Sequence, residues 1–201
     1  MSFPKLIEGL IEELMKLPGI GRRSAERIVF WILNNPKEEA QSLAGNILKL
    51  KEGLMFCRVC NNLSDTDVCR ICTDPSRDQT MICVVEEPKD VLAIERTGAY
   101  SGHYHVLLGT ISPAEGRGPE DLKINDLFQR LTSENIKEVV IATDPDNEGE
   151  MTALYLTKQF NPLSIKITRI GLGIPVGSSV EYADASTLSM SLNSRREIVK
   201  E

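Results

Sequence analysis

The sequence has no long apolar run. Across its 201 residues, no uninterrupted apolar stretch approaches the ~20 residues that a membrane-spanning helix needs. Residues 1–17 also lack the features of a signal peptide, because Lys5, Glu8 and Glu12 interrupt the apolar positions. We therefore expect no membrane partner and predict a cytoplasmic protein.

Motifs for nucleotide hydrolysis and nucleophilic catalysis are missing as well. There is no GxxxxGK[ST] loop to hold a nucleoside triphosphate. Ser178 and Ser179 lack the strand-turn-helix context of a nucleophile elbow. None of the tyrosines has an evident activating neighbour, and the chain is too short for the further domains of a topoisomerase. These absences argue against nucleotide hydrolases, serine hydrolases and topoisomerases.

The composition is that of a compact globular protein with an uneven distribution of charge. Hydrophobic residues make up 41% of the chain, enough for one large domain or two to three small ones. The net charge is −6, and the acidic excess lies entirely in residues 80–201, with 18 acidic and 12 basic groups against 11 of each in residues 1–79. A local basic patch in the first part could still bind phosphates, with strong salt sensitivity.

Apolar periodicity predicts three helices in residues 1–53. The first ends before Pro18, the second runs from Ser24 to Leu33, and the third runs from Glu38 to Leu50. Three short helices enclose little volume, so we expect them to pack against other parts of the chain. The third helix is expected to bury one face, which consists of Ala40, Leu43, Ala44, Ile47 and Leu48.

A glycine turn with basic neighbours, Pro18-Gly19-Ile20-Gly21-Arg22-Arg23, joins the first two helices. Gly19 and Gly21 permit a tight hairpin that leaves backbone N–H groups free at the start of the second helix, where a phosphate oxygen can bind. Arg22, Arg23 and Arg27 lie at the same helix entry and could position DNA without reading its sequence. A plain helical hairpin with solvated arginines is the alternative. The segment resembles the helix-hairpin-helix DNA-binding motif.

Five cysteines in a reducing compartment indicate metal or thiol chemistry and not disulfides. Four of them have the spacing Cys57-x2-Cys60-x8-Cys69-x2-Cys72. Each CxxC turn lets two sulfurs converge on one ion, so the pattern predicts a closed, structural Zn²⁺ site. Redox pairs or buried thiols are the alternatives, and two CxxC units this close favour zinc. Cys83 is expected to be a small buried hydrophobic residue in a strand.

From Thr80 onward, short β-branched runs alternate with helical patterns. Strands are predicted at Met81 to Val85, Tyr104 to Leu108, Glu138 to Thr143 and Ile165 to Ile170. Helices are predicted between them, at Val91 to Glu95, Leu122 to Leu131 and Glu150 to Gln159. This alternation predicts a mainly parallel sheet with helices on its faces.

Carboxylates follow two of these strands at their carboxyl ends. Glu86 comes directly after the first strand, and Asp144-Pro145-Asp146-Asn147-Glu148 follows the third. Sites form at this edge of open parallel sheets. Glu86, Asp144, Asp146 and Glu148 would repel one another without a cation, and their hard oxygen ligands suit Mg²⁺. A loop of solvated acids that caps the next helix is the alternative. The arrangement resembles the Toprim domain, whose signature is a strand-end Glu and a later DxDxE.

The order of these parts resembles the RecR family along essentially the whole chain. Further matches are Asp74-Pro75-Ser76-Arg77-Asp78, Val84-Val85-Glu86-Glu87-Pro88, Gly173-Ile174-Pro175-Val176-Gly177 and Glu181-Tyr182-Ala183-Asp184. The predicted fold class is multi-domain α+β. Its predicted parts are a helix-hairpin-helix region (1–53), a four-cysteine zinc motif with linker (54–79), an α/β Toprim domain (80–175) and a C-terminal segment for subunit contacts (176–201).

The resemblance implies a function. Members of this family form a ring-shaped tetramer that works with RecO and RecF in bacterial recombinational repair to place RecA on single-stranded DNA, and no catalytic turnover is attributed to them. By the same resemblance, Arg23 and Arg27 contact single- and double-stranded DNA, while Glu86 and Asp144 belong to an acidic surface that faces partner proteins. Inward-facing hairpins would act multivalently in such a ring.

One departure keeps a second hypothesis open. Many members of the family lack one or more acids of the DxDxE string, whereas this sequence keeps Asp144, Asp146 and Glu148. The alternative function is therefore a Mg²⁺-dependent nuclease of the Toprim type.

Overall fold

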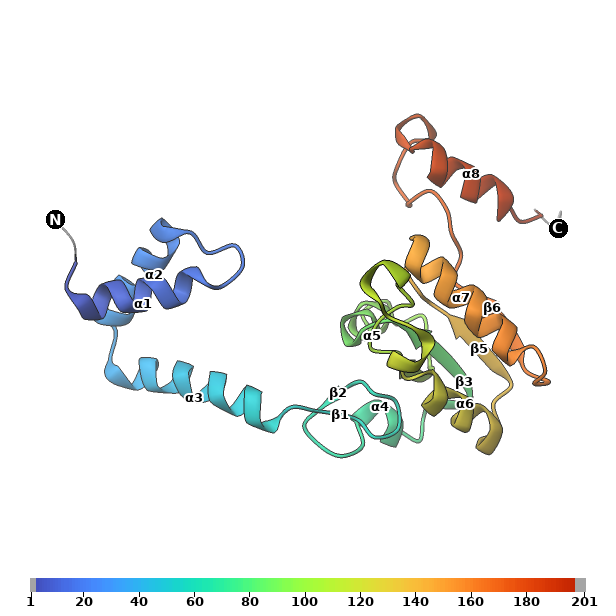
Figure 1. The fold of residues 1–201 in the computed structure, drawn as a ribbon, viewed down its shortest axis with the longest axis horizontal. Coiled ribbons are helices and arrows are strands. Elements are labelled where there is room, and N and C mark those ends of the chain that lie inside the picture. The colour runs from blue at the N-terminus through green and yellow to red at the C-terminus, as the bar shows by residue number, and fades with distance from the viewer. Residues whose placement is uncertain (1–2, 198–201) are drawn as a thin grey trace. The chain divides into compact units, whose positions relative to one another are not determined.

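The computed structural model describes residues 3–197, and the chain divides into two compact units, Met1–Leu54 and Met55–Glu201. The first unit is helical. The second contains the cysteine segment, a four-stranded sheet and a C-terminal helix, in the order shown by the colours of Figure 1. None of the helices among residues 3–197 is long and apolar enough to cross a membrane.

The first unit is built on a pair of amphipathic helices. Helix α1 spans Lys5–Met15, and α2 spans Arg22–Asn34. Their apolar stripes meet in a small cluster that buries Ile11, Ala25 and Val29. Since periodic apolar positions on both helices face this cluster, the predicted helical hairpin is what forms.

Helix α3 spans Lys37–Gly53 and buries none of its residues. The predicted burial of its apolar face is wrong for the single chain: Leu43, Ile47 and Leu48 are between 48% and 60% exposed. Periodicity marks a face that suits burial, but it does not say which surface covers that face. No described element of the first unit supplies this surface.

The second unit begins with the cysteine segment. Strands β1 (Met55–Phe56) and β2 (Leu63–Ser64) form an antiparallel pair, and a one-turn helix, α4 (Arg70–Thr73), follows them. Three of the cysteines are buried together in a cluster of their own. This short segment has little regular structure. We therefore expect a metal ion bound by its cysteines to stabilise it.

The sheet has four strands in the order β4-β3-β5-β6, and every neighbouring pair is parallel. This confirms the predicted parallel sheet. The strands are β3 (Asp78–Val85), β4 (Gly102–Val106), β5 (Glu138–Ile141) and β6 (Lys166–Arg169). The helices that connect them are α5 (Pro88–Glu95), α6 (Ile124–Ser133) and α7 (Asn147–Phe160).

Both faces of the sheet are covered, because consecutive residues of a strand point to opposite faces. Ile82 and Val84 of β3 pack into the larger core with α6 and α7, whereas Cys83 and Val85 pack into a second core with α5. Cys83 is 2% exposed and lies outside the other four cysteines, as expected. The two cores hold the strand ends in fixed positions.

Several details differ from the sequence pattern. Strand β4 ends at Val106 and not at Leu108, because Leu108 adopts φ 63° and turns the chain. Two short 3₁₀ helices, Pro113–Glu115 and Pro119–Asp121, interrupt the loop that follows. A further 3₁₀ turn (Val180–Tyr182) precedes a C-terminal helix, α8 (Ala185–Asn193), that the apolar pattern did not reveal.

Candidate nucleic-acid interface and metal site

The turn between α1 and α2 has the geometry that its glycines suggested. Gly19 adopts φ 79°, a left-handed conformation that favours glycine, and Ile20 packs against the cluster of Ile11, Ala25 and Val29. Helix α2 starts at Arg22 after Gly21, and no side chain caps it. The first-turn N–H groups of α2 therefore have no partner inside the helix or at its cap, and they carry the positive end of the helix dipole.

The three arginines at this helix entry differ in how they are engaged. Arg22 donates from Nη2 to the Glu8 carboxylate at 2.9 Å and from Nε to Glu26 at 3.1 Å. The hydrogen bond and charge of Glu8 raise the pKa of Arg22. Arg23 and Arg27 are exposed and form no ion pair within residues 3–197. Their guanidinium groups are thus available to an anion beside the turn, whereas that of Arg22 would first have to leave its carboxylates.

The four cysteines come together as the spacing predicted. Their sulfur atoms all lie within 4.8 Å of one another, and no other group of three or more His, Cys, Asp or Glu side chains in residues 3–197 comes so close. Hydrogen bonds from the Cys60 and Cys72 thiols hold the pKa of Cys69 far below its usual range, which favours a thiolate. Four converging soft ligands with no further donor fit a closed Zn²⁺ site. Cys57, Cys60, Cys69 and Cys72 are thus placed so that they could hold the structural zinc.

Backbone hydrogen bonds shape the two CxxC turns and attach them to the sheet. The Asn61 amide donates to the Cys57 carbonyl at 2.9 Å, and Asn61 adopts φ 59° to close that turn. The Val106 amide at the end of β4 donates to the Cys60 carbonyl at 2.8 Å, and Ile71 of α4 packs into the core beneath α5. The zinc segment is therefore tied to one edge of the sheet.

The strand-end acids lie where the sequence suggested, but two of their carboxylates hydrogen-bond to backbone amides. Glu86 accepts a hydrogen bond at 2.8 Å from the Asp144 amide, across the carboxyl ends of β3 and β5. Asp146 is the N-cap of α7 and accepts from the Gly149 amide at 2.8 Å. Glu148 lies in the first turn of that helix. These contacts give the acidic loop a fixed conformation.

The electrostatics of this loop follow from burial and like charge. Burial raises the pKa of Glu86 to about 7, and the charges of Asp144 and Asp146 act in the same direction. The four acids do not gather their oxygens into one metal-binding group within the described residues. A Mg²⁺ site here stays a prediction, as does the alternative of an acidic patch that binds a partner.

The two histidines of β4, His103 and His105, are both buried. His105 is fully buried, with Nε2 2.8 Å from the Lys123 carbonyl oxygen, and burial lowers its pKa to about 4. Sequence reasoning missed two arginines of the same unit. Arg77 donates to the Gly102 carbonyl at 2.8 Å and pairs with Glu95, which ties the segment before β3 to β4 and α5. Arg169, at the end of β6, pairs with Glu150.

Comparisons with known proteins account for nearly the whole chain. Family models match in the order of the elements. They are the helix-hairpin-helix of RecR at residues 7–50, the four-cysteine zinc finger domain of RecR at 54–74, the Toprim domain at 80–171 and the C-terminal region of RecR at 173–196.

Curated relatives match over similar lengths and carry one name. The chain is 51% identical over 189 residues to "Recombination protein RecR" of Heliobacterium modesticaldum, which covers 94% of this chain and 95% of the relative. It is 51% identical over 193 residues to the protein of that name from Acidothermus cellulolyticus, at 96% and 97% coverage. The Clostridium perfringens protein is 49% identical over 196 residues and 98% of each chain.

Proposed function

The chain belongs to the RecR recombination protein family, and we propose from this membership that it binds DNA in recombinational repair as a mediator and not as an enzyme. In this role it helps RecO and RecF to load the recombinase on single-stranded DNA. It binds single- and double-stranded DNA as a homotetrameric ring in the bacterial cytoplasm, at the nucleoid.

One observation carries the DNA-binding part of the proposal. The uncapped N-terminus of α2 lies directly after the Gly19–Gly21 turn. Arg23 and Arg27, on the first turns of the same helix, have no ion-pair partner in the part of the chain that the structure describes. The unsatisfied backbone amides, the positive end of the helix dipole and the two guanidinium groups together favour binding of a phosphate oxygen. These groups read no base edge, so the binding is independent of sequence.

The charge distribution supports a multivalent arrangement. One hairpin offers only a few groups to phosphates, and the chain as a whole has a net charge of −6. Several copies that present their hairpins to one nucleic acid would act together and overcome this weakness. The acidic excess of residues 80–201 then suits an outer surface that meets partner proteins.

The zinc segment has a structural role in this scheme. When bound, zinc cross-links the two CxxC turns. The chain's own contribution is the hydrogen bond from Val106 to Cys60 and the packing of Ile71, which fix the cross-linked segment against the sheet. Since the segment carries few apolar groups, binding of the metal contributes directly to its folding.

The acids at the sheet edge form the second proposed surface. Asp144, Asp146 and Glu148 are partly or fully exposed, and the hydrogen bond from the Asp144 amide to Glu86 holds the loop in place. A fixed array of carboxylates can pair with basic side chains of a partner or with a divalent cation. We favour the partner, because the four carboxylates are spread out and two of them already accept hydrogen bonds from the backbone.

A binding measurement tests the proposal. Fluorescence anisotropy with labelled single-stranded and duplex DNA is compared for the wild type, Arg23→Ala and Arg27→Ala, with Lys158→Ala on α7 as a control for loss of a positive charge. Each hairpin substitution should weaken binding about tenfold or more and reduce the salt slope by about one for each hairpin that contacts the DNA, and the control should change neither. If both arginine variants bind like the wild type, the hairpin is not the DNA site.

The intact DxDxE acids support the nuclease as the second candidate. Its test is incubation of labelled DNA with the protein in the presence of Mg²⁺ or Mn²⁺, comparing the wild type with Asp144→Asn. Cleavage by the wild type that the substitution abolishes would favour the nuclease. A mediator leaves the DNA intact under every condition.

A further inference from the structure

An apolar groove of about 370 Å³ lies between the zinc segment and helix α5. Its lining comes from both of these parts: Asn62, Leu63 and Ile71 of the zinc segment, and Pro88, Lys89, Val91, Leu92 and Glu95 of α5. Leu63 and Leu92 are 45% and 54% exposed. The two walls thus place two solvent-exposed leucines in one hollow, although they are far apart in the sequence.

The charged groups that line the groove already have partners. Glu95 accepts a hydrogen bond from the Tyr104 hydroxyl at 2.7 Å and pairs with Arg77. The Lys89 ammonium lies 2.7 Å from a carboxylate oxygen of Glu87. Because these charges are paired within the chain, the surface left for an incoming group is mainly apolar. The groove therefore suits a bulky apolar side chain.

Both walls are held in place by contacts beneath them. Val91 of α5 is buried in the core on this face of the sheet, and Ile71 of the zinc segment packs against the same core. The Val106 amide, at the end of β4, donates to the Cys60 carbonyl at 2.8 Å. Since the walls are fixed before anything binds, an occupant meets a preformed site that needs little reorganisation.

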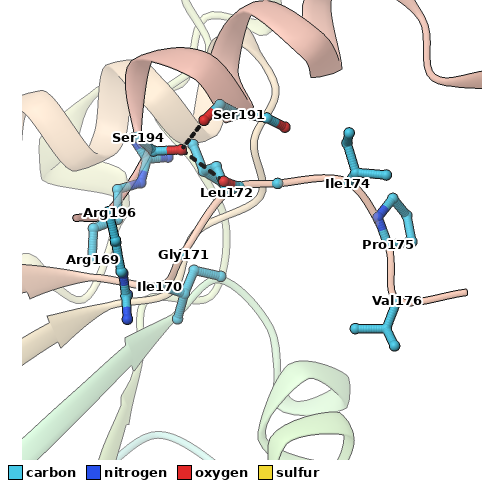
Figure 2. A pocket seen from close by; sticks show the side chains of 11 residues that line it. Arg169, Ile170, Gly171, Leu172, Ile174, Pro175, Val176, Ser191, Ser194 and Arg196 are labelled. Atoms are coloured by element: carbon cyan, nitrogen blue, oxygen red, sulfur yellow. Dashed lines mark hydrogen bonds between the residues drawn. The ribbon is translucent and has the colours of Figure 1, made fainter. Parts of the chain in front are cut away.

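A larger hollow in the same unit, of about 720 Å³, is built differently. Figure 2 shows Arg169 and Arg196 on one side of it and Ile174 and Val176 on the other. None of the described residues from 171 to 197 is buried, so no core fixes the part of this wall that they form. The groove beside α5 is the one whose two walls both rest on buried residues.

Acidic side chains surround the start of α5, next to the groove. Residues 86–95 contain four acidic side chains and one lysine. Asp90 accepts a hydrogen bond from the Glu87 amide at 2.8 Å, and burial together with the charge of Asp144 raises the pKa of Asp90. The acids of α5 therefore continue the acidic surface at the sheet edge. Such a rim attracts Lys and Arg side chains and repels the phosphates of nucleic acid.

We propose that this groove binds a short segment of a partner protein in which one bulky apolar side chain lies beside Lys or Arg residues. The apolar side chain enters between Leu63 and Leu92, and the basic residues pair with the acids at the start of α5. The proposal rests on the proposed function only in that the acidic surface meets partner proteins. It adds that the zinc segment forms one half of the docking site.

Peptide selection tests the groove. A random peptide library displayed on phage is selected against the full, zinc-loaded chain. The enriched peptides are then titrated by fluorescence anisotropy against the wild type, Leu63→Gln, Leu92→Gln and Leu154→Gln, all of which keep the charge unchanged. Leu154 on α7 is the control, because it is 72% exposed and does not line the groove. Melting curves show that each variant folds.

The enriched peptides should carry an apolar residue flanked by Lys or Arg. Either groove substitution should weaken their binding about tenfold or more, whereas the control should leave it unchanged. Replacement of the apolar residue of the peptide by alanine should have an effect of similar size. Added salt should weaken binding as well, because the charges at the rim are exposed.

The other outcomes overturn the groove and are distinct from failure of the proposed function. A selection without binders contradicts the proposal, as do peptides that bind both groove variants like the wild type. Peptides that lose affinity only for Asp144→Asn overturn the groove and leave the acidic surface standing. DNA binding through Arg23 and Arg27 is measured separately, and neither groove substitution should alter it.

Discussion

At the scale of single residues, the acidic loop depends on a glycine as well as on its carboxylates. A Cβ at Gly149 would lie 2.1 Å from the Asp144 carbonyl oxygen and 2.8 Å from Glu86 Oε1. The same glycine donates its amide to Asp146, and its carbonyl accepts from the Thr143 hydroxyl at 2.9 Å. Only a residue without a side chain lets the start of α7 approach the ends of β3 and β5 this closely.

The first prediction concerns this close approach. Gly149→Ala should lower the free energy of unfolding by about 1–3 kcal/mol, because the backbone oxygen of Asp144 cannot move away without breaking its loop. Urea denaturation gives the change. Gly45→Ala is the control, since nothing lies within 4 Å of that position on α3, and it should be neutral or slightly stabilising. Equal effects of the two substitutions would contradict the close contact.

The second prediction concerns the raised pKa of Glu86. Burial, together with nearby carboxylates, moves this pKa from 4.5 to about 7 on folding. The folded state then holds the proton more tightly than the unfolded chain, so the contribution of Glu86 to stability is most favourable below pH 4.5 and declines as the pH rises towards 7. Glu86→Gln should remove this decline. Thermal unfolding across that range, in buffer without divalent cations, should give a flatter profile for the variant; identical profiles would refute the raised pKa.

At the scale of elements, the sequence predicted those features that depend on residues close together in the chain. Alternation of β-branched runs and helical stretches identified the four parallel strands, and the CxxC spacing identified the four cysteines that come together, because both patterns are short-range. Neither pattern predicted the 2.8 Å hydrogen bond that the Asp144 amide donates to Glu86, because this bond joins residues far apart in the chain. Nor did either pattern reveal that Glu8 pairs with Arg22, since that pairing depends on how α1 packs on α2.

The third prediction concerns the zinc segment as one element. Cys60→Ser should lose the bound zinc and the amide protection of residues 55–73. It should also lose the protection of the Val106 amide, which donates to the Cys60 carbonyl. The core shared by β3, β5, α6 and α7 uses none of these residues and should stay protected. Metal analysis and hydrogen exchange give both readouts. Cys83→Ser is the control, because its thiol is buried outside the site, and it should retain zinc. Full zinc content in Cys60→Ser would contradict the ligand set.

At the scale of the whole molecule, several surfaces of the single chain suit contact with other molecules. Exposed apolar side chains gather on α3 at Leu43, Ile47 and Leu48, and again at Val180 and Tyr182 near α8. Exposed apolar side chains that recur along one segment are candidates for contact with a partner. Sequence periodicity could identify these faces but not their partners, which explains why burial on α3 was mispredicted.

The most direct test of the central claim is amide hydrogen exchange of residues 17–27 with and without DNA. The account predicts that DNA slows exchange at the amides of Gly21, Arg22 and Arg23, because phosphate oxygens accept from the uncapped start of α2. Amides on the opposite end of that helix, near Asn34, should not change. If DNA binds and these turn amides exchange at unaltered rates, nucleic acid is held elsewhere and the account is contradicted.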